Sequence, residues 1–160
     1  MSIKKGDRVP TGDLAIMTDS GPGKISTDEL FSGKKVVLVS VPGAFTPTCS
    51  LNHLPGFVDH ADEIRSKGVD TIACMAVNDV FVMNAWGKDR KADDKVKMLA
   101  DGNGDFTRAL GLEMDGSKFG LGKRGKRFAM VVEDGVVTHL AVEEPGKFEV
   151  SKAEAILEQL

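Results

Sequence analysis

The apolar run at residues 36–41, "VVLVSV", limits the fold more than any other stretch of this chain. It is rich in β-branched residues and shows little alternation, a pattern typical of a strand buried on both faces of a parallel sheet. A second such run, "VDTIACMAV" at residues 69–77, follows a helical stretch predicted for residues 48–67, and a weaker strand is predicted in "KVKMLAD". Strands and helices that alternate in this order predict a parallel centre with right-handed crossovers.

Start and stop signals define the first helices. Ser26 and Glu29 have capping-box spacing, which predicts a short helix after a turn in "GPGKIS". The helix that follows the first buried strand is predicted to kink or break at Pro55 and Gly56. Gly68 is predicted to stop that helix.

Further elements are predicted on both sides of this centre. Residues 14–17 are expected to be extended, and Asp79 can cap a helix that follows the second buried strand. Two β runs flank an Asp134-Gly135 turn, which is a strong hairpin signal, and Ser151 can cap the final helix. The chain is therefore predicted to be an α/β protein with a central mixed β-sheet flanked by helices.

Length and charge narrow the possible functions. At 160 residues, with 41% hydrophobic and 28% charged side chains, the chain fits one compact domain over residues 1–160. The net charge of −3 gives no basic field for nucleic acid or an anionic membrane. No apolar leader or bilayer-spanning segment is recognised. Two cysteines are too few for a secreted disulfide framework, so a cytoplasmic, reducing location is expected.

Cys49 lies just after the first buried strand, where the next helix is predicted to begin. Unpaired N–H groups at the start of a helix stabilise a thiolate and make cysteines nucleophilic. A free cysteine is otherwise a small buried hydrophobe, but the neighbours Thr46, Pro47, Thr48 and Ser50 are polar or turn-forming. The position therefore favours a reactive cysteine.

The segment "VPGAFTPTCSLNHLPGF" at residues 41–57 resembles the active-site segment of the peroxiredoxins, specifically the type II or peroxiredoxin-5-like subfamily. Pro42, Thr46 and Cys49 match its Pro-x-x-x-Thr-x-x-Cys pattern. Residues 76–88 and 126–137 are similar to two further blocks of that subfamily at matching distances. The resemblance covers essentially the whole chain. It implies a thioredoxin-like fold and an enzyme that reduces hydrogen peroxide and alkyl hydroperoxides.

The resemblance also implies roles for individual residues. The thiolate of Cys49 would attack the O–O bond and become a sulfenic acid. Thr46 resembles the threonine whose hydroxyl contacts thiolate and peroxide, and Pro42 the proline that shields the site. Spacing alone leaves both Arg124 and Arg127 as candidates for the family arginine. Arg127 is favoured because it abuts the strand "FAMVV", whereas Arg124 lies in a glycine-rich loop and is expected to be solvated.

Cys74 is the internal candidate for reducing oxidised Cys49. It occupies a position where the type II subfamily often has a second cysteine, but its surroundings read as a buried strand, so it is either resolving or structural. No cysteine follows it in the chain. We expect one-cysteine behaviour, with glutathione, glutaredoxin or thioredoxin as the external electron donor.

Two other functions are compatible with a reactive cysteine. His53 lies four residues after Cys49, which raises the alternative of a Cys-His nucleophile that hydrolyses acyl groups. A peroxide sensor or a chaperone built on the same fold would also oxidise at Cys49. Multiple turnover with excess reductant distinguishes a peroxidase from a sensor or chaperone, and an ester-hydrolysis assay compared with peroxide consumption distinguishes it from a hydrolase.

Cofactor patterns in the sequence are incomplete. Asp101, Asn103 and Asp105 imitate a calcium loop, but Phe106 stands where the sharp turn needs glycine and Leu112 where a bidentate glutamate belongs. The stretch "GPGKIS" lacks the third glycine of a dinucleotide fingerprint. No calcium or dinucleotide site is therefore expected, and the resemblance to the peroxiredoxins implies an enzyme without metal, haem or flavin.

Aromatic residues near these motifs suggest packing surfaces. Phe81, Met83 and Trp86 have helical spacing and are predicted to form one packing face. Phe45 is either an ordinary core residue or part of a dimer interface, since aromatic side chains near the active-site loop contribute to such an interface in the family. A homodimer is thus implied by the resemblance.

Overall fold

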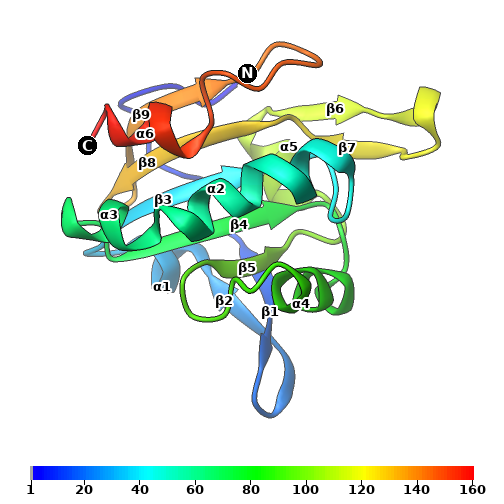
Figure 1. Ribbon diagram of the computed structural model, residues 1–160, viewed down its shortest axis with the longest axis horizontal. Coiled ribbons are helices and arrows are strands. Elements are labelled where there is room, and N and C mark those ends of the chain that lie inside the picture. Colours follow the sequence, from blue (N-terminus) through cyan, green and yellow to red (C-terminus); the bar gives the residue numbers. More distant parts are fainter. Residues whose placement is uncertain (1) are drawn as a thin grey trace.

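The computed structural model describes residues 2–160, and its main feature is a seven-stranded mixed sheet with the strand order β2-β1-β5-β4-β3-β8-β9 (Figure 1). β3, β4 and β5 pair in parallel, which confirms the predicted centre, whereas the pairs β1–β2, β1–β5, β3–β8 and β8–β9 are antiparallel. The strands are β1 (Asp13–Thr18), β2 (Gly21–Ser26), β3 (Lys35–Ser40), β4 (Thr71–Ala76), β5 (Lys97–Ala100), β8 (Phe128–Glu133) and β9 (Val136–Val142).

Helices cover the sheet, and a separate two-stranded ribbon projects beyond it (Figure 1). The ribbon consists of β6 (Glu113–Asp115) and β7 (Lys123–Gly125). The helices are α1 (Thr27–Phe31), the π-helix η1 (Cys49–His53), α2 (Leu54–Asp59), α3 (Ala61–Ser66), α4 (Val80–Asp89), α5 (Asp105–Leu110), the 3₁₀-helix η2 (Ser117–Phe119) and α6 (Ala153–Leu157). Among residues 2–160, no helix has the length and apolar character needed to cross a membrane.

The central strand β3 has apolar side chains on both of its faces. Val37 and Val39 belong to a buried cluster that contains residues of α2, α3, α4 and α6. Val36 and Leu38 belong to a second buried cluster that contains residues of α1 and α5. Successive side chains of a strand point to opposite faces, so a strand covered on both sides is apolar throughout. This confirms the interpretation of residues 36–41.

Several local predictions are confirmed. Ser26 and Glu29 form the capping box of α1, with each side chain accepting a backbone N–H. The Asp79 carboxylate accepts the Val82 N–H at the start of α4. Asp134 and Gly135 both have positive φ in the turn between β8 and β9, as a type I′ hairpin requires.

Two local predictions are wrong, and one is correct in part. Gly21–Ser26, expected to be a turn, is strand β2 because it pairs along its whole length with β1. The long helix changes next to Pro55, where the π-helix η1 gives way to α2, as the predicted kink or interruption requires, and it has a further break at His60, between α2 and α3. The residue before α6 is Lys152, and the Ser151 hydroxyl is bonded to Glu143 instead of capping the helix.

Candidate active site

The topology brings three chain segments to one edge of the sheet. β8 runs antiparallel to β3 and pairs Phe128 with Ser40, so the residue before β8 lies where β3 ends. β9 runs antiparallel to β8 and pairs Val142 with Phe128, so the residue after β9 lies there too. The segment that leaves β3 carries Cys49. This edge is where open α/β sheets place their ligand sites.

Cys49 is the first residue of the π-helix η1 and is fully buried, with a free thiol. The Leu54 N–H donates to the Cys49 carbonyl, five residues back. This wide turn directly precedes Pro55, which has no N–H to give to the Leu51 carbonyl. Single π-turns of this kind are frequent at functional sites. Among the hydrogen bonds of residues 2–160, none uses the Cys49 N–H, which leaves it available to a bound group.

Arg127 lies directly against the thiol. Its Nη2 donates to Cys49 Sγ at 3.1 Å, and its Nη1 lies 2.8 Å from His53 Nδ1. The planar guanidinium thus spans the two side chains with two different nitrogens, a geometry that a lysine cannot reproduce. The sequence preference for Arg127 over Arg124 therefore selects the arginine that contacts Cys49.

His53 is held in one protonation state. Its Nε2 lies 3.0 Å from the Ser151 carbonyl oxygen, which can only accept, so Nε2 carries the proton and Nδ1 accepts from Arg127. Burial, and next the positive charge of Arg127, lower the pKa of His53 from 6.5 to about 4. The ring is therefore neutral at pH 7. Since both ring nitrogens are occupied, His53 forms no hydrogen bond to Cys49 of the kind that a Cys-His acyl hydrolase needs.

We expect the free energy of unfolding to fall as the pH is lowered from about 6.5 to about 4, through His53. In this range the unfolded chain binds a proton at His53 that the folded protein excludes. The contribution of His53 to the free energy of unfolding is therefore complete above the pKa of the unfolded state and is lost as the pH falls towards the pKa of the folded state. The difference between the unfolded pKa of 6.5 and the folded pKa of about 4 corresponds to about 3 kcal/mol of unfolding free energy. Urea unfolding of wild type and His53→Gln at pH 7 and pH 4 measures the effect. A pH dependence that is identical in the two proteins would contradict it.

Thr46 and Pro42 line the same turn. The Thr46 hydroxyl donates to the Gly43 carbonyl at 2.7 Å, and the Thr46 carbonyl accepts the Ser50 N–H at 2.8 Å. The hydroxyl proton is thus engaged within the turn, while the oxygen lone pairs remain able to accept a proton donor. Within residues 2–160 no hydrogen bond joins Thr46 to Cys49 itself.

Arg124 is half-buried and hydrogen-bonded to the protein, whereas its glycine-rich surroundings suggest a fully solvated side chain. Its Nη1 donates to the Pro42 carbonyl at 3.2 Å, and its Nε donates to the Leu121 carbonyl at 3.0 Å. The guanidinium lies so close to Gly43 that a Cβ there would come within 2.7 Å of Nη1. The ribbon β6–β7 thereby holds the turn that lines the active site, a long-range contact that sequence spacing does not reveal.

Comparisons with known proteins show the family of the chain. Residues 4–157 match the Redoxin family. The chain is 49% identical over 159 residues to Peroxiredoxin-2B of Arabidopsis thaliana, with 99% of this chain and 98% of the relative covered. The chain belongs to the peroxiredoxin family. It is accordingly a thiol-dependent peroxidase with a thioredoxin-like fold.

Solved structures of other peroxiredoxins have the same fold. Reduced Prx3 from Vibrio vulnificus, in complex with H₂O₂, is 53% identical with a TM-score of 0.95, and the match covers 98% of each chain. Peroxiredoxin 5 from Alvinella pompejana is 39% identical with a TM-score of 0.86, and 98% of this chain and 96% of that chain are covered. The resemblance to the peroxiredoxin-5-like subfamily, inferred from the motif, is thus confirmed.

The second cysteine of this peroxiredoxin lies in the core. Cys74 is on β4, opposite Val39 of β3, and belongs to the same buried cluster as Cys49. Burial raises the pKa of the Cys74 thiol far above its ordinary value, with the neighbouring Cys49 as the next cause. At neutral pH Cys74 is therefore a protonated thiol and a poor nucleophile.

The predicted packing face of α4 is only partly correct. Met83 and Trp86 are buried, and the Trp86 indole N–H donates to the Ser50 hydroxyl at 2.8 Å, next to Cys49. Phe81, in contrast, is 63% exposed. Phe45, which is 50% exposed with a φ of 65°, has its ring centroid 6.4 Å from that of Trp86, so it is not an ordinary core residue.

The calcium-like loop has a structural role. Both carboxylate oxygens of Asp101 are bonded, one to the Phe106 N–H and the other to the Thr107 N–H and hydroxyl, at the start of α5. Asp101 is buried, not solvated as a turn residue would be. In the part of the chain that the structure describes, no group of three or more His, Cys, Asp or Glu side chains is arranged to hold a metal ion.

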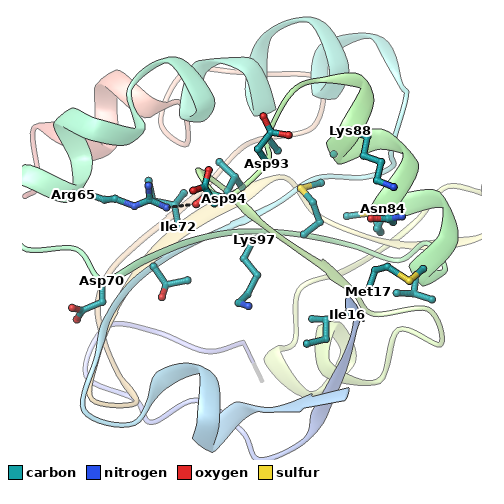
Figure 2. A pocket seen from close by; sticks show the side chains of 17 residues that line it. Ile16, Met17, Arg65, Asp70, Ile72, Asn84, Lys88, Asp93, Asp94 and Lys97 are labelled. Carbon is teal, nitrogen blue, oxygen red and sulfur yellow. Dashed lines mark hydrogen bonds between the residues drawn. The ribbon is translucent and has the colours of Figure 1, made fainter. Parts of the chain in front are cut away.

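A cavity of about 520 Å³ is present whose lining does not include Cys49, and Figure 2 shows the side chains that line it. It is lined by residues of β1, β4, β5 and α4, and none of Pro42, Thr46, Cys49 and Arg127 lines it. Its charged side chains are of both signs in equal number: Arg65, Lys88, Lys97, Asp70, Asp93 and Asp94. It therefore offers no net charge to select an ionic ligand.

Proposed function

We propose that this protein reduces hydrogen peroxide and small alkyl hydroperoxides through Cys49, assisted by Thr46, Pro42 and Arg127. The observation that carries the proposal is the 3.1 Å contact between Arg127 Nη2 and Cys49 Sγ, because it places a fixed cation and hydrogen-bond donor where the thiolate reacts. The proposal is also supported by a related protein, because reduced Prx3 from Vibrio vulnificus has been solved in complex with H₂O₂.

The reaction has a simple balance. The Cys49 thiolate attacks one peroxide oxygen, an S–O bond forms, and the O–O bond breaks. The departing oxygen leaves as alkoxide or hydroxide and takes a proton to become alcohol or water, while the cysteine becomes a sulfenic acid. The Thr46 oxygen would accept the peroxide O–H, and the Cys49 N–H and Arg127 would stabilise the negative charge that develops on the oxygens.

Thiolate formation alone is a small part of the rate enhancement. An ordinary thiol with a pKa of about 8.5 is roughly 3% ionised at pH 7, so complete ionisation gains at most about thirtyfold. Nucleophilicity also falls as the pKa falls, which reduces this gain. The larger contribution is expected from donors that are already oriented towards the peroxide oxygens, and we assign this role to Arg127 and the turn around Thr46.

We further propose that an external thiol reduces the sulfenic acid. Cys74 is a buried, protonated thiol on a central strand, and such a group is a poor attacking nucleophile. A first external thiol would form a mixed disulfide with Cys49 and release water, and a second thiol would release reduced Cys49. Glutathione with glutaredoxin, or thioredoxin, are the proposed donors.

Steady-state peroxide consumption by the wild type, with each donor system offered separately, tests this function. We expect many turnovers per protein molecule with at least one donor, and an amount of oxidised donor that is proportional to the peroxide added. Consumption of a single equivalent with every donor would contradict the enzymatic role and favour a sensor or a chaperone.

We also propose a homodimer, which the family resemblance implies and which is supported by large apolar side chains that are exposed in the monomer. Phe45 is 50% exposed, and Leu51 of η1 and Phe81 of α4 are each 63% exposed. Association with a second copy would bury such side chains. Light scattering is expected to give the dimer mass for wild type and a lower mass for Phe81→Asp at equal concentration. A monomer mass for the wild type would contradict the proposal.

The remaining expectations from the sequence are also proposals. We propose a single domain over residues 1–160 and a cytoplasmic location. Peroxiredoxin-2E of Arabidopsis thaliana, which is 50% identical to this chain, is named as chloroplastic. Fractionation of the cells that produce the protein, with antibody detection, tests the location.

A further inference from the structure

We propose that three residues of the β9–α6 segment (residues 143–151), namely Glu143, Phe148 and Ser151, position the catalytic arginine: Glu143 acts through Ser151 and His53 to fix Arg127 against Cys49. This inference rests on the proposed function, in which Arg127 assists Cys49. It assigns positioning roles to Glu143, Ser151 and His53, none of which touches the reacting sulfur atom.

The first step is the closure of the β9–α6 segment by one carboxylate. Glu143 Oε2 accepts the Glu149 N–H at 2.7 Å, the Ser151 N–H at 2.9 Å and the Ser151 hydroxyl at 2.7 Å. Glu143 is buried, and although burial raises its pKa, the hydrogen bonds from Ser151 and Glu149 lower it below its ordinary value overall. Glu143 is thus ionised at neutral pH and fixes the backbone at Ser151.

The second step runs from the backbone of Ser151 to the guanidinium. The Ser151 carbonyl accepts the proton of His53 Nε2 at 3.0 Å, which leaves His53 Nδ1 as the acceptor for Arg127 Nη1 at 2.8 Å. The Glu143 N–H also donates to the Arg127 carbonyl at 2.9 Å. Residue 143 is therefore connected to both ends of Arg127, directly to its backbone and through two residues to its side chain.

The third step is contact by an aromatic ring of the same segment. Phe148 meets His53 edge to face, with ring centroids 5.0 Å apart and an interplanar angle of 64°. Arg127 Cζ lies 5.9 Å from the centroid of the Phe148 ring, within the range of a cation–π contact. Phe148 thus contacts both side chains and limits their movement.

This arrangement keeps the positive charge of Arg127 available. No salt bridge joins Arg127 to a carboxylate within residues 2–160, and its side-chain partner is a neutral imidazole. A carboxylate in direct contact would orient the guanidinium equally well but would offset its field at the thiolate. Glu143 acts on the Arg127 side chain only through Ser151 and His53. The guanidinium is therefore held in place while more of its positive field at the thiolate is kept.

The test is single-turnover oxidation of Cys49 by hydrogen peroxide across a range of pH in four proteins: wild type, Glu143→Ala, Glu143→Gln and Glu144→Ala. The groups that face Cys49 are Arg127 and Cys74, with His53 behind the arginine.

We expect Glu143→Ala to lower the rate constant about tenfold or more and to move the pH–rate profile to higher pH. Glu143→Gln keeps an acceptor oxygen and is expected to remain within about threefold of wild type. The matched control Glu144→Ala removes an exposed neighbour and is expected to change neither quantity.

The outcomes separate this inference from the proposed function. If wild type is not oxidised at Cys49, the proposed function fails. If wild type reacts rapidly and Glu143→Ala has the same rate and the same pH–rate profile, the positioning role is wrong. A lower maximum rate with an unmoved profile also overturns it, because that result indicates a general loss of structure. Where Glu143→Ala does not fold, Ser151→Ala and Phe148→Leu replace it, and unchanged profiles in both refute the inference.

Discussion

Replacement of Cys49 by serine is expected to abolish peroxide consumption, whereas Cys74→Ser is expected to keep full turnover. A serine hydroxyl is not ionised near neutral pH and is a far weaker nucleophile, so the first step of the reaction is lost. Cys74 is fully buried in β4 and protonated at neutral pH, so its loss removes a small packing group and no reactive one.

Peroxide consumption by the three proteins, with glutathione plus glutaredoxin and with thioredoxin, measures both effects. Thermal unfolding serves as the control, because Cys74→Ser places a hydroxyl in the core and lowers stability without touching chemistry. Loss of turnover in folded Cys74→Ser, with a Cys49–Cys74 bridge found in wild type by mass spectrometry, would show that Cys74 resolves the sulfenic acid.

Replacement of Arg127 by glutamine is expected to lower kcat/KM for peroxide by about 10²–10³, the usual effect of removing a donor aimed at developing negative charge. Glutamine lacks the cation and cannot contact both Cys49 and His53 as the two terminal nitrogens do. Arg127→Lys restores a charge without the planar fork and is expected to recover only part of the loss.

Lys126→Gln is the matched control, because it removes an exposed positive charge from the adjacent position. If Lys126→Gln lowers kcat/KM as much as Arg127→Gln does, the loss comes from the reduced positive charge near the site and not from the lost contact between Arg127 and Cys49. An Arg127→Gln protein with wild-type kcat/KM would remove the arginine from the mechanism altogether.

The centre of the fold could be predicted because its signals are local. The run at residues 36–41 has apolar side chains on both faces. A strand with this pattern is stable only where both faces are covered, which is the middle of a sheet with helices on both sides. Cys49 was predicted from its position after a buried strand, whereas Arg127 was preferred because it abuts the strand "FAMVV" as the arginine of the resembling family does, and the pairing of β8 with β3 brings the two segments together. The motif then distinguished these residues from their neighbours.

The positioning network could not be predicted because its contacts are distant in sequence. Glu143 and Glu144 are adjacent carboxylates, and only the fold shows that one is buried against Ser151 while the other faces solvent. Arg124 was assigned to solvent for the same reason, since its partner Pro42 is 82 residues away. The exposure of Phe81 conflicts with helical periodicity, which records spacing and not what covers a face.

The hydrogen bond between Trp86 and Ser50 supplies an intrinsic optical probe of the reactive cysteine. The chain has one tryptophan and no tyrosine, so its near-ultraviolet emission comes essentially from this one indole. The indole N–H is bound to the residue that follows Cys49, within the π-turn itself. Any rearrangement of that turn when the sulfur changes oxidation state alters the polarity around the indole. Stopped-flow fluorescence can therefore follow oxidation and reduction of Cys49 without a label or a coupled assay.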